Sequence, residues 1–154
     1  MATASAKGSR MPAKIYVING PNLNLLGFRE PTIYGNDSLD DIGRMLAKRA
    51  EELGVEIDMR QSNHEGHLVD WLHEAHFEGA KAVLLNAAAY THSSIAILDA
   101  IKSINVPVIE VHISDPTVRE EFRRTSFVGM GAVATVQGMG SQSYLCALEK
   151  AVAL

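Results

Sequence analysis

The chain has 154 residues, of which 47% are apolar and 21% charged, and a formal net charge of −4. These values are typical of one globular domain with a single core, and the negative balance argues against an extended nucleic-acid-binding surface. Its single cysteine, Cys146, excludes an internal disulfide and a metal site built from several cysteines. No apolar run is long enough to span a membrane.

The first twelve residues, MATASAKGSRMP, lack the apolar centre of a secretory signal. We therefore expect residues 1–12 to be a flexible N-terminal extension or a remnant of cloning. Residues 13–154 are expected to form one domain of a cytoplasmic protein, with Cys146 as a buried, inert thiol.

Beyond the N-terminal extension, strand-like apolar runs alternate with segments of helical period. The first strand, 14–19, is followed by a loop punctuated by Gly and Pro, GFREPTIYG (27–35), which shows neither period. A helix then begins after Ser38, which can form a capping box with Asp41, and ends at Gly54. The rest of the chain predicts strands at 55–62, 82–87, 107–114 and 132–138, and helices at 65–79, 93–104, 115–124 and 140–154.

Five strand–helix repeats with continuous apolar strands predict an α/β fold, a doubly wound parallel sheet of five strands with helices on both faces. Ligands bind such folds beyond the carboxyl ends of the strands. The segments at that edge carry many neutral hydrogen-bonding side chains and no lysine, which argues against Schiff-base chemistry. They also lack a carboxylate pair or a phosphate-binding loop after the first strand, which argues against magnesium and flavin sites.

Two histidines, His92 and His112, follow apolar strands at this edge. Glu110 lies two residues before His112, so both side chains point to the same face of the strand. A carboxylate in that position can orient the imidazole for general acid catalysis, although a buried structural ion pair has the same pattern. His64 and His67, three residues apart, leave a metal-dependent hydrolase open as an alternative.

Charged residues are concentrated in the predicted helix 115–124, for which Asp115 is the expected N-cap. Arg119 and Arg123 are four residues apart and would share one helical face, which favours an anion opposite them. The amides at the start of this helix would add to the anion site. Glu120 and Arg124 could form an ordinary surface pair, and a solvated charged helix is the alternative to an anion site. Two other histidines, His73 and His76, lie mid-helix and are expected to be solvated.

An edge of this kind suits proton removal next to a carbonyl and loss of a hydroxyl from a small, carboxylate-bearing polyol. The chain from about Ile15 onward resembles the type II 3-dehydroquinate dehydratases through NGPNLNLLGFREPTIYG, QSNHEGHLVDWLH, NAAAYTHSS, PVIEVHIS and REEF. The resemblance implies a flavodoxin-like fold, a single catalytic domain over 13–154, and a homododecamer of four trimers. It also implies cofactor-free and metal-free conversion of 3-dehydroquinate to 3-dehydroshikimate through an enolate, in the shikimate pathway or alternatively in quinate breakdown.

The same resemblance implies roles for individual residues. Tyr34 would remove a proton from carbon 2, Arg29 would keep that tyrosine ionised and stabilise the enolate, and Asn22 would hold a water against the oxyanion. His112 would protonate the departing hydroxyl, with Glu110 beside it. The implied substrate-binding set is Asn86, His92, Ile113, Ser114, Arg123 and, across a trimer contact, Asp99.

Two departures from the family pattern stand out. Ala88 and Ala89 occupy a segment that often carries glycine, and alanine would cost about 1 kcal/mol there if a positive φ were required. SDPTV (114–118) replaces a more usual Asn-x-His-x stretch and leaves the local contacts of Arg119 open. A non-catalytic, flavodoxin-like binding module is the remaining alternative to an enzyme.

Overall fold

The computed structural model describes residues 11–28 and 30–154, apart from the side chains of Pro31 and Tyr34. Its centre is a sheet of five parallel strands in the order β2-β1-β3-β4-β5. This order reverses between β1 and β3 and is that of the flavodoxin-like topology, which confirms the predicted fold class. The strands are β1 (Lys14–Asn19), β2 (Glu56–Gln61), β3 (Ala82–Asn86), β4 (Val108–Val111) and β5 (Ala134–Val136).

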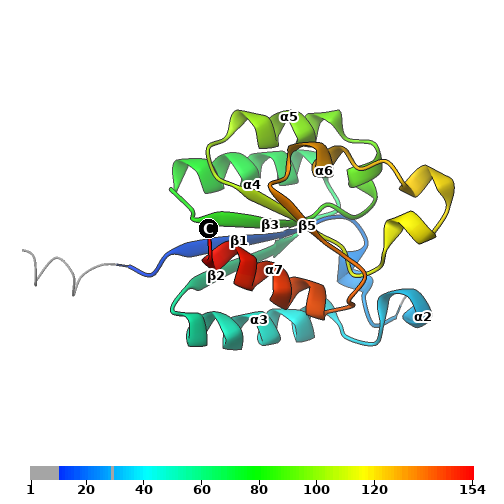
Figure 1. The fold of residues 1–154 in the computed structure, drawn as a ribbon, viewed down its shortest axis with the longest axis horizontal. Helices are drawn as coiled ribbons and strands as arrows, with labels where there is room; N and C mark the ends of the chain where they lie inside the picture. Colours follow the sequence, from blue (N-terminus) through cyan, green and yellow to red (C-terminus); the bar gives the residue numbers. More distant parts are fainter. Residues whose placement is uncertain (1–10, 29) are drawn as a thin grey trace, which may run out of the picture.

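Helices cover both faces of the sheet (Figure 1). On one face α3 (Leu39–Leu53) and α7 (Gln142–Val152) pack against the strands through a core that includes Leu46 and Tyr144. On the other face α4 (Glu65–Phe77), α5 (Ile95–Ser103) and α6 (Phe127–Gly131) enclose a second core around Leu72 and Ile97. The burial of the central strands on both faces explains why their sequences are almost continuously apolar.

The start of α3 shows how local chemistry fixes an element. Ser38 accepts a hydrogen bond from the amide of Asp41 at 3.1 Å, and the Asp41 carboxylate accepts one from the amide of Ser38 at 2.9 Å. The helix ends at Gly54, whose φ of 72° lies in the left-handed region. The capping box and the terminating glycine are both confirmed.

The predicted helix 115–124 is wrong. The segment forms two 3-10 turns, η3 (Pro116–Val118) and η4 (Glu121–Arg123), because Arg119 and Glu120 between them adopt extended backbone angles. A continuous helix would place Arg119 and Arg123 on one face, whereas the broken form lets Glu120 approach both guanidiniums. The short elements η1 (Leu23–Leu25), α2 (Pro31–Tyr34), η2 (Ala88–His92) and α6 are not predicted by the sequence pattern.

Within the described ranges, none of the helices is long and apolar enough to cross a membrane. Cys146 is partly buried on α7 and packs against the core beneath α3 and α7. Residues 1–10 lie outside the described residues, so the expected flexible extension stays a prediction.

Candidate active site

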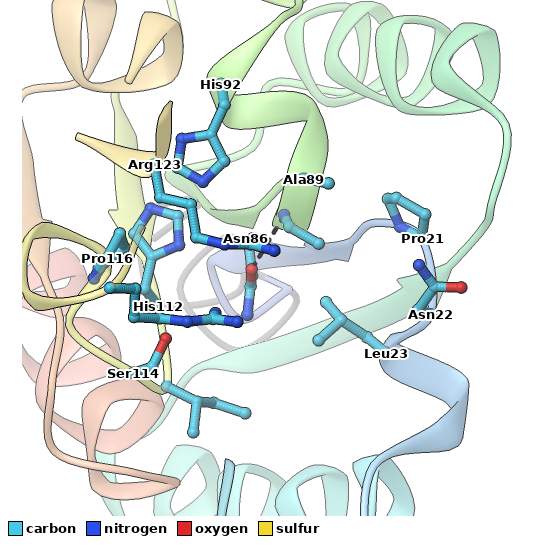
Figure 2. Close-up of a pocket in the computed structure, with 13 residues that line it drawn as sticks. Pro21, Asn22, Leu23, Asn86, Ala89, His92, His112, Ser114, Pro116 and Arg123 are labelled. Atoms are coloured by element: carbon cyan, nitrogen blue, oxygen red, sulfur yellow. Dashed lines mark hydrogen bonds between the residues drawn. The ribbon is translucent and has the colours of Figure 1, made fainter. Parts of the chain in front are cut away.

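A cavity of about 250 Å³ opens beyond the carboxyl ends of β1, β3 and β4, where this sheet order places ligands. Figure 2 shows that its walls come from segments far apart in the sequence, with His92, His112 and Arg123 directed toward a common hollow. The predicted site residues that line it are Asn22, Asn86, His92, His112, Ile113, Ser114 and Arg123.

The pair of Glu110 and His112 is confirmed. His112 Nε2 lies 2.7 Å from Glu110 Oε2, and the two residues are only 7% and 2% exposed. Burial acts to raise the pKa of Glu110, but hydrogen bonds from His112, Ser126 and Thr135 and the imidazolium charge outweigh it and lower the pKa to about 2. Glu110 is therefore a carboxylate at neutral pH, and Nδ1 is the nitrogen of His112 that is left for a ligand.

The orientation of His92 is set by the backbone. Its Nδ1 lies 2.7 Å from the carbonyl oxygen of Thr125, and because a carbonyl only accepts, Nδ1 carries the proton. Burial lowers the pKa of His92, as do the charges of His112 and Arg123, against the opposing effect of the Thr125 bond. The neutral ring therefore offers Nε2 as an acceptor for a ligand hydroxyl.

Asn86, the last residue of β3, is held at both ends of its amide. Its Nδ2 donates to the hydroxyl of Tyr144 at 2.9 Å, and its Oδ1 accepts from the amide of Ala88 at 3.1 Å. Tyr144 in turn donates to Oδ1 of Asn19 at 2.6 Å. Ala88 has a φ of 52°, so the condition under which alanine is strained at this position is met.

Asn22 begins η1 with a φ of 69°, a conformation that asparagine tolerates better than most residues. Its amide donates to Oδ1 of Asn63 at 3.0 Å, which ties the segment after β1 to the segment after β2. The amides of Ile113 and Ser114 donate to no acceptor among the described residues, and both residues line the cavity.

Positive charge at the cavity comes from guanidiniums rather than from helix amides. Arg119 and Arg123 both line the cavity, whereas the amide of Thr117 is already taken by the Asp115 carboxylate at 3.0 Å. The expected anion site at a helix N-terminus is therefore wrong. Glu120 pairs with Arg123 rather than with Arg124, since it accepts from Nε of Arg123 at 2.7 Å.

The class II dehydroquinase family model matches residues 13–152 of the chain. The chain belongs to this family. It is 53% identical to a 3-dehydroquinate dehydratase of Phenylobacterium zucineum over 94% of this chain and 99% of that protein. It is 54% identical to the enzyme of the same name from Trichodesmium erythraeum over 90% and 91%. The type II dehydroquinase structure from Butyrivibrio crossotus superimposes with a TM-score of 0.89 at 41% identity, covering 91% of this chain and 97% of that chain.

Four predicted site residues of this class II dehydroquinase are not among the described residues that line the cavity. Glu110 lies behind it, in contact with His112. Arg29 and the side chain of Tyr34 lie outside the described residues. Asp99 is exposed on α5 and does not line the cavity of the single chain.

The remaining histidines of the dehydroquinase fold lie on α4 or just before it. The rings of His64 and His67 are 4.8 Å apart, and His67 Nδ1 lies 2.7 Å from Ser62 Oγ. No three His, Cys, Asp or Glu side chains in residues 11–28 and 30–154 converge as metal ligands would. His73 is exposed as expected, whereas His76 is not simply solvated, because its Nδ1 accepts from the amide of Asn105 at 3.1 Å.

The polar side chains behind the cavity are not predicted by the sequence pattern. Thr91, Ser126 and Thr135 all contact the Glu110 carboxylate, and Tyr144 contacts Asn86. A signal existed for Thr135, because it is the partner of Glu110 in the parallel register of β4 and β5. That register can be predicted only when the strand order is known.

Proposed function

We propose that this chain catalyses the dehydration of 3-dehydroquinate to 3-dehydroshikimate without a cofactor. The observation that carries the proposal is His112, which lines a cavity together with Asn86, His92 and Arg123 and is held from behind by the buried Glu110 carboxylate. Membership of the class II dehydroquinase family supports the same activity.

The elimination proceeds in two steps. The phenolate of Tyr34 takes a proton from carbon 2, and the electron pair of that bond moves to the neighbouring carbonyl to form an enolate. Arg29 keeps the phenolate ionised, and Asn22 holds a water against the enolate oxygen. The enolate then expels the hydroxyl from the adjacent carbon as His112 donates a proton to it, so that water and a conjugated enone leave.

The cavity supplies the groups that hold such a substrate. The amides of Ile113 and Ser114 donate hydrogen bonds to its carboxylate, with the guanidinium of Arg123 nearby. The neutral His92 and the fixed amide of Asn86 pair with its hydroxyls. These contacts orient the hydroxyl that leaves toward Nδ1 of His112.

The quaternary structure is also a proposal. The enzyme forms a homododecamer of four trimers in which Asp99, exposed on α5, completes the site of a neighbouring subunit. We place it in the cytoplasm and in the biosynthetic shikimate pathway, with quinate breakdown as the alternative. Residues 13–154 act as the single catalytic domain.

The proposal is tested by following the absorbance of the conjugated product with purified enzyme. His112→Ala should lower kcat by roughly 10²–10⁴-fold, the usual contribution of a general acid, because Nδ1 is the proton donor. His73→Ala, which removes an exposed histidine of α4, is the matched control and should keep full activity. Absence of product with the wild-type enzyme would favour the binding module instead, and loss of activity on addition of a chelator would favour the metal-dependent hydrolase.

A further inference from the structure

The carboxylate of Glu110 is contacted by three side-chain hydroxyls in addition to His112. Thr91 Oγ1 donates to Oε2 at 3.0 Å, Ser126 Oγ contacts the same oxygen, and Thr135 Oγ1 donates to Oε1 at 2.8 Å. These hydroxyls come from η2, from the N-cap of α6 and from β5. Three separate elements therefore converge on one buried charge.

The number of available protons shows how the hydroxyls are shared. Thr91 Oγ1 and Ser126 Oγ lie 2.7 Å apart, so Thr91, Ser126 and Glu110 make three contacts with only two hydroxyl protons. Because the ionised carboxylate has no proton to give, at least one of the two hydroxyls donates to it at any moment. Thr135 adds an independent donor on the other oxygen.

The carboxylate is also fixed in position. Two neighbouring residues of η2 contact two neighbouring residues just before α6. Thr91 Oγ1 contacts Ser126 Oγ, and His92 Nδ1 donates to the Thr125 carbonyl. A Cβ added at Gly129 would lie 2.9 Å from Glu110 Oε1, so the carboxylate packs closely against the α6 backbone at a position where only glycine leaves room for it. The positions of His92 and of the Glu110–His112 pair are thereby coupled through one segment.

We propose that Thr91, Ser126 and Thr135 are positioning residues that set the acid strength of His112 through Glu110, an inference that rests on the proposed function. Once His112 has given its Nδ1 proton to the leaving hydroxyl, Glu110 no longer has a cation beside it. Hydroxyl donors stabilise this state more than the starting ion pair, because the imidazolium already satisfies much of the carboxylate charge before transfer. They therefore help the proton to leave.

The other groups that face the pair do not change in the variants needed to test this inference. The charged or titratable side chains near it are His92 from η2 and Arg119 and Arg123 from the 116–124 segment. The contacts from β5 and α6 come from Thr135, Ser126 and Gly129, none of which titrates. A shift in the pH profile of a hydroxyl variant therefore reports on the Glu110–His112 pair.

The test uses Thr135→Val, which keeps the side-chain shape, with Thr135→Ser to restore the hydroxyl. In the full-length enzyme, Thr135→Val should lower kcat by about tenfold, change KM less than about twofold, and move the basic limb of the kcat profile to higher pH, since His112 holds its proton more tightly. Thr135→Ser should restore both. Ser103→Ala, which loses a 2.7 Å hydroxyl bond to the Asp99 carbonyl on α5, is the control.

A second variant, Thr91→Val, removes a hydroxyl on a different element and shows whether the effect is confined to β5. It should shift the pH profile of kcat in the same direction as Thr135→Val. Normal kcat and an unmoved profile in both folded variants would overturn the inference. A fall in kcat that Thr135→Ser does not reverse, with no movement of the profile, would also overturn it, because that pattern indicates a packing role. Inactivity of the wild-type enzyme would instead count against the proposed function.

Discussion

Glu110 is a buried carboxylate whose ionised form is stabilised only in the folded protein. Its pKa falls from 4.5 to about 2 on folding, so it stabilises the fold above pH 4.5 and this contribution is lost as the pH falls from 4.5 toward 2. We expect the free energy of unfolding of the wild type to fall more steeply over this range than that of Glu110→Gln. Urea denaturation at a series of pH values measures both, and parallel curves would show that Glu110 is not selectively stabilised.

Ala88 adopts a backbone conformation that favours glycine, with a φ of 52°. Ala88→Gly should therefore raise the free energy of unfolding by up to about 1 kcal/mol, since the left-handed conformation costs alanine roughly 1–2 kcal/mol and glycine gives back part of this in chain entropy. Ala89→Gly, in the same turn but without a positive φ among the described residues, is the control and should not stabilise. An equal loss of stability in both variants would show that the backbone of Ala88 is not strained.

The i, i+2 spacing of Glu110 and His112 was sufficient to predict their contact, because side chains alternate along a strand. The sequence also predicted that Ala88 would be strained if its φ were positive. The hydroxyls of Thr91, Ser126 and Thr135 could not be found this way, since their approach to Glu110 depends on strand order and on the path of the chain before α6.

The regular helices and strands were predictable because each carries its own period and its own caps. The structure of the 115–124 segment was not predictable from its sequence. Asp115 and Pro116 are typical of a helix start but here begin a 3-10 turn, and Glu120, with an extended backbone, then accepts a hydrogen bond from Arg123. The helix α6 is only five residues long and contains two glycines, so it shows no helical period. Elements that depend on side-chain contacts with distant segments cannot be predicted from the local sequence pattern.

Helix α7 contributes to the site through one hydroxyl. Tyr144→Phe should lower the free energy of unfolding by about 1–3 kcal/mol, since it leaves buried polar atoms of Asn19 and Asn86 unpaired. It should also raise KM, because the Asn86 amide loses its orientation. Tyr16→Phe, which removes a hydroxyl bonded to Glu74 on the α4 side of the sheet, should leave KM unchanged. Denaturation and steady-state kinetics measure both effects, and equal KM values would contradict the role of α7.

The whole molecule should be larger than one chain of 16.7 kDa. Light scattering is expected to give about twelve times this mass, and Asp99→Ala should raise KM while the assembly persists, because Asp99 is proposed to act in a neighbouring site. A stable, fully active monomer would contradict this proposal. So would an unchanged KM in the assembled Asp99→Ala enzyme.

The order of proton transfers is the central claim, and isotope exchange in heavy water tests it most directly. Wild-type enzyme should form 3-dehydroshikimate, and Tyr34→Phe should neither exchange the carbon 2 hydrogen of 3-dehydroquinate nor form product. His112→Ala should continue to exchange that hydrogen while product formation falls by roughly 10²–10⁴-fold, because the acid acts after the enolate has formed. Normal exchange in Tyr34→Phe, or near-normal product formation in His112→Ala, would contradict the account.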